Sequence, residues 1–142
     1  WGGKPPMDIE EFIQALATVD SRLDVGLSYS DYSEIVGEAS VFKGMVDEDI
    51  VADIDYCASA HSGAEFALLT YSLAASRWND CIFDDYDCEV DDLDLSSSWV
   101  ISGNAVEAAQ TALVDRTPID PDSEIGQLID VMNGGSDSLS DL

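Results

Sequence analysis

The spacing of apolar residues along the chain is helical almost throughout. The first predicted helix begins at Asp8, with Glu11 in a capping-box-like position, and stops near Gly26. Its apolar face carries Ile9, Phe12, Ile13, Leu16 and Leu23. The second predicted helix begins near residues 28–30, and its apolar stripe carries Tyr32, Ile35, Ala39, Phe42 and Val46. No alternating run bounded by turns occurs, so strands are not expected.

The third predicted helix is apolar on two sides. It begins around residues 47–49, where acidic side chains suit the positive end of the helix dipole, and runs to about Trp78. One face carries Cys57, Ala60, Ala64, Ala67, Leu68, Tyr71, Ala75 and Trp78. The other carries Phe66, Leu69 and Leu73. A helix of this kind is expected in the middle of a bundle.

A fourth helix is predicted after Asp94 or Ser96, with Gly103 as its weak point. Its inward face carries Leu95, Trp99, Val106, Ala109 and Leu113. Prolines at 118 and 121 end it, and residues 123–132 have the pattern of a short amphipathic helix. The sequence therefore predicts an all-α bundle of about four helices. An N-terminal extension (1–7) precedes the bundle (8–116), and an acidic tail (117–142) follows it.

The composition combines a foldable chain with strong acidity. Apolar residues make up 46% of the 142 positions, which is enough for one domain with a core. Against 30 Asp and Glu stand only 5 Lys and Arg, so the net charge is −25. Nucleic acid and anionic membrane surfaces carry the same sign, and neither is an expected partner. No charge-free stretch approaches the ~20 residues that membrane insertion requires.

Residues 79–94 form an acidic loop with eight carboxylates, no basic residue, and both Cys81 and Cys88. A disulfide can close this spacing, and the chain-entropy model assigns it about 2.5 kcal/mol. On a continuous third helix Cys57 lies ~36 Å from Cys81, beyond bridging range, so it is expected to be a buried free thiol. The alternative is three reduced cysteines in a cytoplasmic protein.

The carboxylates of the acidic loop suit a hard cation such as calcium. The expected ligands are Asp84, Asp85, Asp87 and Asp91. An EF-hand register starting at Asp85 places Val90 where a turn glycine is needed and Ser96 where a bidentate Glu belongs. Any calcium affinity should therefore be weak, at ~10⁻⁴–10⁻³ M or poorer. A thiolate site is not expected, and His61, the only histidine, is expected to be structural.

The segment Trp78-Asn79-Asp80-Cys81, followed by Cys88, an acidic run and a helix with Trp99, carries a resemblance. It is similar to small helical extracytoplasmic domains of unknown function associated with actinobacteria. The likeness covers the layout of residues 29–113 and is sharpest over residues 78–99. It implies an extracellular or cell-surface location and a disulfide, and it implies no reaction. A first residue other than Met fits the processing of an exported protein.

The functional expectation is a non-catalytic structural or protein-interaction domain outside the cytoplasm, self-association included. No nucleophile elbow, P-loop or dinucleotide fingerprint occurs, so no enzyme class is indicated. Two alternatives stay open. One is a calcium-dependent binding module that uses the acidic loop. The other is an acidic decoy, a DNA mimic, for a nucleic-acid-binding protein.

The net charge of −25 predicts that salt stabilises the fold. The screening length falls from ~10 Å at 0.1 M to ~3 Å at 1 M ionic strength, and repulsion among the carboxylates falls with it. We expect the melting temperature to rise over this range of sodium chloride, as followed by circular dichroism. An unchanged melting temperature would mean that bound ions or specific contacts already compensate the charge.

Overall fold

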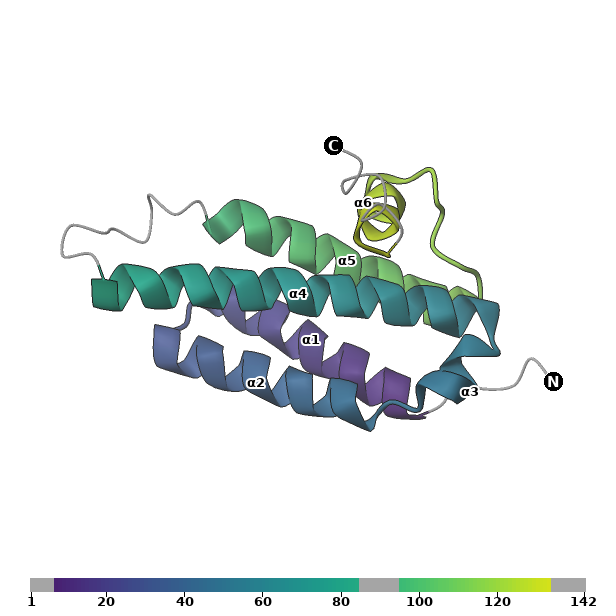
Figure 1. Cartoon of the computed structure of the whole chain (residues 1–142), viewed down its shortest axis with the longest axis horizontal. Coiled ribbons are helices and arrows are strands. Elements are labelled where there is room, and N and C mark those ends of the chain that lie inside the picture. The colour runs from purple at the N-terminus through teal and green to yellow at the C-terminus, as the bar shows by residue number, and fades with distance from the viewer. Residues whose placement is uncertain (1–6, 85–94, 134–142) are drawn as a thin grey trace.

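The computed structural model describes residues 7–84 and 95–133, and over these residues the chain is all-α (Figure 1). The helices are α1 (Met7–Val25), α2 (Tyr29–Met45), α3 (Glu48–Ala52), α4 (Asp55–Asp84), α5 (Leu95–Asp115) and α6 (Glu124–Asn133). This part of the chain holds no strand. The predicted fold class is confirmed.

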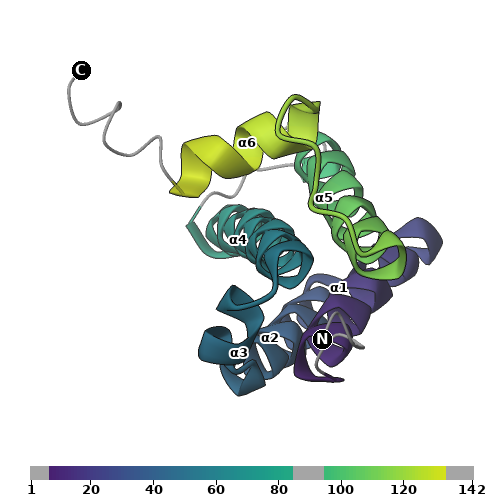
Figure 2. The same ribbon diagram turned by 90° about the vertical axis from the view of Figure 1, so that its right-hand side faces the viewer.

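The four long helices form the bundle, and the two short ones are attached to it. α4 lies between α2 and α5, and α1 closes the ring by packing on both of those helices. α3 packs against α4, and α6 lies crosswise over α4 and α5 (Figure 2). The short helix predicted within residues 123–132 is therefore present, and it contributes the buried Ile129 to the core.

The connection between α1 and α2 follows the sequence prediction. Gly26 has φ +107°, a left-handed conformation that glycine adopts without strain, and its N–H donates to the Arg22 carbonyl at 3.1 Å. The Ser28 side chain then caps α2 by accepting from the Asp31 N–H at 3.2 Å. A glycine stop followed at once by a serine cap folds α2 back along α1.

The third predicted helix is divided in two, so the prediction of one continuous helix from residue 47 was wrong. Asp47 caps α3 as expected by accepting from the N–H groups of Asp49 and Ile50, but α3 ends after Ala52. Val51 and Tyr56 are both buried. Five residues apart on one helix, they would point about 140° away from each other. The break between α3 and α4 lets both side chains reach the same core.

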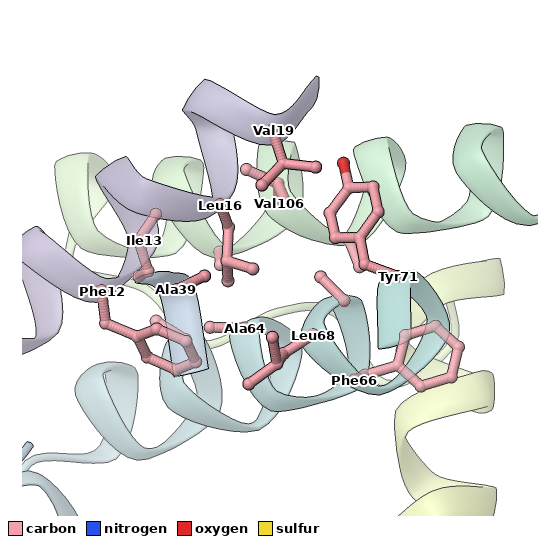
Figure 3. Close-up of a cluster of buried hydrophobic side chains, with 14 of the residues drawn as sticks. Phe12, Ile13, Leu16, Val19, Ala39, Ala64, Phe66, Leu68, Tyr71 and Val106 are labelled. Carbon is pink, nitrogen blue, oxygen red and sulfur yellow. The ribbon is translucent and has the colours of Figure 1, made fainter. Parts of the chain in front are cut away.

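The helices α4 and α5 pack together through small residues. Gly63 of α4 faces Ala105 and Ala109 of α5, and all three residues are buried, as are Ala64 and Ala67 of α4. A Cβ atom on Gly63 would lie 2.9 Å from Ile119 Cδ1 and 3.6 Å from the Ala109 Cβ. Larger side chains from α1, including Phe12 and Leu16, fill the space beside this contact (Figure 3). Close approach of α4 and α5 thus sets the width of the bundle.

The second apolar face of α4 is only partly covered. Phe66 is buried and points toward α6 (Figure 3), but Leu69 and Leu73 are 44% and 54% exposed. The expectation that this whole face lies inside the bundle was therefore wrong. α6 has ten residues and crosses α4 at a steep angle, so it shields one end of the face and leaves the next two turns open.

Four aromatic rings join α2, α4 and α5 at the end of the bundle where α4 finishes. The centroid of Trp78 lies 5.5 Å from Tyr29, 5.7 Å from Tyr32 and 6.0 Å from Trp99. The Tyr32 hydroxyl donates to the Tyr71 carbonyl at 2.7 Å and accepts from Trp99 Nε1 at 3.1 Å. Tyr32, Trp78 and Trp99 pack in or against the core, on the faces that the sequence predicted, and Tyr32 ties three helices together.

Removing the Tyr32 hydroxyl should destabilise the fold more than removing that of Tyr29. In Tyr32→Phe, Trp99 Nε1 loses its acceptor in a water-poor site, which costs about 1–3 kcal/mol of unfolding free energy. The matched control is Tyr29→Phe in the same cluster, where the hydroxyl bonds the half-buried Asn79 side chain at 3.2 Å. Its cost should stay below about 1 kcal/mol. Urea denaturation measures both, and equal costs would contradict the bridging role of Tyr32.

Candidate functional sites

The side chains predicted to bind calcium in the acidic loop are not among those that the structure describes. Asp85, Asp87, Asp91 and Cys88 lie outside the described residues, as does the side chain of Asp84. The weak calcium site and the Cys81–Cys88 disulfide therefore stay predictions.

Cys57 lies as the sequence predicted, whereas Cys81, which was predicted to follow the helix in the acidic loop, lies within α4. α4 runs without interruption from Asp55 to Asp84, which separates Cys57 from Cys81 along a rigid helix. Cys57 is free and buried, and Cys81 is buried near the far end. Burial raises the pKa of the Cys57 thiol, and a hydrogen bond with Tyr56 opposes that shift. A buried thiol of raised pKa is a poor nucleophile, so Cys57 is a packing residue.

The clearest cluster of chemically active side chains surrounds His61 on α4. His61 Nδ1 lies 2.8 Å from Glu65 Oε1, one helical turn further along. The imidazole is only 8% exposed, and its ring packs edge-on against Phe12 with centroids 6.0 Å apart. Glu65 also forms an ion pair with Lys43 of α2, whose Nζ is 3.8 Å from Oε2. One buried imidazole is therefore held against a carboxylate that remains partly open to solvent.

Glu48 completes this cluster from the first turn of α3. The candidate ligand atoms of Glu48, His61 and Glu65 all lie within 4.8 Å of one another. The sequence did contain one signal for the site, because His61 and Glu65 are four residues apart on a helix and share a face. The position of Glu48 depends on the break between α3 and α4, which the sequence analysis missed.

A groove of about 320 Å³ runs between the antiparallel helices α1 and α2. Its apolar part is formed by Ala15, Ile35 and Phe42. Two exposed carboxylates, Glu11 and Glu38, lie at its edges. The polar side chains of Gln14 and Thr18 complete the lining. The groove combines an apolar surface with negative charge, and none of its described lining residues is basic.

Asp20 occupies a strained electrostatic position between α1 and α5. A Cβ atom on Gly103 would lie 2.6 Å from Asp20 Oδ1, so the glycine that weakens α5 locally also makes room for this carboxylate. Burial raises the pKa of Asp20 above its ordinary value, and the charges of Asp24 and Glu107 raise it further. The charged form of Asp20 is therefore disfavoured in the folded chain.

Comparison with known proteins gives no relative: no protein-family model, curated protein or solved structure matches this chain. The resemblance to an extracytoplasmic domain family therefore remains a proposal. None of the described helices is both long enough and apolar enough to cross a membrane. The candidate sites rest on their geometry alone.

Neutralising Asp20 should stabilise the protein near pH 7. Its pKa is higher in the folded chain than in the unfolded one, so the folded chain binds more protons between the two values. The unfolding free energy therefore rises as the pH falls from the folded pKa to the unfolded pKa of Asp20. Above the folded pKa, the charged Asp20 destabilises the fold to its full extent. Asp20→Asn should therefore raise the melting temperature at pH 7, with a smaller gain once the pH falls below the folded pKa.

The control for Asp20 is Asp130→Asn, which removes one exposed carboxylate from α6. It relieves the general repulsion by the same unit of charge without changing the α1–α5 contact. Thermal melts of both variants, from pH 7 down to the pH at which the protein unfolds in acid, separate the local effect of Asp20 from the general effect of net charge. Equal gains at every pH would show that only the net charge matters.

Proposed function

We propose that this chain is a non-catalytic protein-interaction domain whose groove between α1 and α2 receives a basic, amphipathic helical segment of a partner protein. The groove carries the proposal because it offers an apolar surface edged by the carboxylates of Glu11 and Glu38. Grooves of this kind bind helices through apolar residues spaced three or four positions apart. The extracellular setting remains part of the proposal, on the strength of the sequence resemblance.

Charge favours a basic partner. The chain carries a net charge of −25, and such a field attracts cationic surfaces and accelerates their encounter. Apolar contact with Ala15, Ile35 and Phe42 would then hold the partner in one orientation. Long-range attraction supplies the rate of association, and the groove supplies the specificity.

A basic partner is favoured over a second copy of the same chain. The open apolar positions Leu69 and Leu73 on α4 offer a surface for self-association. Two copies would, however, bring together two chains of net charge −25. Their repulsion opposes contact unless salt screens it. Self-association is therefore the weaker form of the proposal, confined to high ionic strength.

Fluorescence anisotropy with a labelled helical peptide tests the proposal. The peptide carries leucines at positions i, i+3, i+4 and i+7 and lysines elsewhere. A scrambled peptide of identical composition has the same charge without the apolar face. We expect the amphipathic peptide to bind the full chain more tightly than the scrambled one, and the difference to persist as sodium chloride is raised.

Two charge-matched variants locate the binding site. Glu11→Gln with Glu38→Gln removes both groove carboxylates, and the expected loss is about fivefold in affinity at ~0.5 kcal/mol for each ion pair. Asp122→Asn with Asp130→Asn removes two exposed carboxylates elsewhere and should change affinity much less. Equal losses in both variants, or equal binding of the two peptides, would reduce the interaction to non-specific charge attraction and refute the groove.

A further inference from the structure

We propose that Glu48, His61 and Glu65 form a binding site for a divalent transition metal of the zinc class. The ligands come from two helices that the sequence separates, with Glu48 in the first turn of α3 and the other two on adjacent turns of α4. Their candidate ligand atoms lie within 4.8 Å of one another. The site shares no residue with the α1–α2 groove, and the proposal does not depend on that groove.

The geometry of the three side chains is close to that of a metal site. Zinc binds imidazole nitrogen and carboxylate oxygen at ~2.0–2.2 Å, which places ligand atoms roughly 3–3.5 Å apart around the ion. His61 Nδ1 and Glu65 Oε1 are already 2.8 Å apart, a hydrogen-bond distance. The proton between them has to leave Nδ1 before this nitrogen binds a metal, and the two atoms then move slightly apart. Glu48 is exposed, so its side chain is free to turn toward the other two. His61 and Glu65 are thus already next to each other, and the carboxylate of Glu48 has to move only a short distance toward them.

The surroundings of His61 identify Nδ1 as the ligand atom. Nε2 is buried, and it has no hydrogen-bond partner among the described residues. Nδ1 faces Glu65, whose side chain is 34% exposed, so this side of the ring is the one that opens toward solvent. The Phe12 ring fixes the imidazole from the core side. Burial of the ring and packing against it hold Nδ1 in one place before any metal arrives.

The chemistry of the ligands selects the class of metal. Imidazole favours zinc, cobalt, nickel and copper, whereas calcium and magnesium prefer oxygen ligands alone. Two carboxylates give the site two negative charges, which one divalent ion neutralises. Three protein ligands leave further coordination positions for water on the Glu48 side. The acidic surface attracts all cations, but only this cluster adds a nitrogen ligand.

Lys43 is the built-in competitor for this site. Its ammonium lies 3.8 Å from Glu65 Oε2 and partly neutralises the carboxylate that the metal would use. A metal ion at Glu65 Oε1 therefore competes with Lys43 for the charge of this carboxylate. Removing the lysine should therefore strengthen metal binding. If Lys43 only stabilised the fold, its removal would leave metal binding no stronger.

A bound metal would fasten α3 to α4 across their break. Glu48 precedes Asp53, the C-cap of α3, while His61 and Glu65 follow it. An ion held by both helices fixes the angle between them and stabilises only the folded chain. The melting temperature should therefore rise with metal concentration.

The test uses the full chain with Zn²⁺ in calorimetry and Co²⁺ in absorption spectroscopy, in ~0.15 M sodium chloride with excess Mg²⁺. Magnesium occupies the general acidic surface and does not compete for a nitrogen ligand. We expect one equivalent of Zn²⁺ to bind and raise the melting temperature. Co²⁺ should give visible bands typical of low coordination without a near-ultraviolet thiolate band, which excludes the cysteines.

Four variants decide the outcome. His61→Gln and Glu48→Gln should each weaken Zn²⁺ binding at least about tenfold, and the exposed Glu48 can be changed without touching the core. Lys43→Gln should strengthen binding more than the charge-matched Arg22→Gln, which lies on the last turn of α1. Zn²⁺ binding that survives both ligand changes, a thiolate band with Co²⁺, or equal effects of the two charge changes would overturn the site.

Discussion

The fold depends on one helix that is almost uncharged in an otherwise strongly acidic chain. Over residues 57–78, the greater part of α4, only Glu65 and Arg77 carry a formal charge at neutral pH. Every other described helix packs directly on α4. Helices of like charge could not surround a charged centre without a large desolvation cost. Most acidic side chains in the described part of the chain are therefore exposed to water. Asp20 is half-buried with a raised pKa, and Glu65 is held by His61 and Lys43.

Helix propensity disfavours glycine at two positions in the bundle, but close packing requires it there. Gly63 and Gly103 each weaken the helix that contains them. The first lies where α4 meets α5 and Ile119, and the second where α5 meets Asp20 of α1. A side chain at either position would push a neighbouring group away. From the sequence Gly103 looked like a defect of the fourth helix. In the fold it marks a contact between helices.

The helical pattern alone predicted most of the architecture, because apolar periodicity and caps are local properties. Gly26, Ser28 and Asp47 begin or end helices where the sequence placed them. The break after Ala52 was missed because it follows from a tertiary requirement, the burial of both Val51 and Tyr56. The exposure of Leu69 was missed for a similar reason, since it depends on where α6 crosses α4. The His61 cluster depends on both a local property and a tertiary requirement. The spacing of His61 and Glu65 is visible in the sequence, but the approach of Glu48 requires the break.

The two proposed sites use the same acidity through different physics. The α1–α2 groove would recruit a basic segment through the field of many carboxylates, a long-range interaction that salt weakens. The Glu48–His61–Glu65 cluster would bind a metal through direct coordination at ~2 Å, which screening affects far less. The effect of salt therefore distinguishes binding at the groove from binding at the metal cluster in a single sample. Salt that weakens the binding of the basic partner to the groove should leave the metal in place. Direct coordination adds a selectivity that the net charge cannot supply, because the field of the carboxylates does not distinguish cations of the same valence.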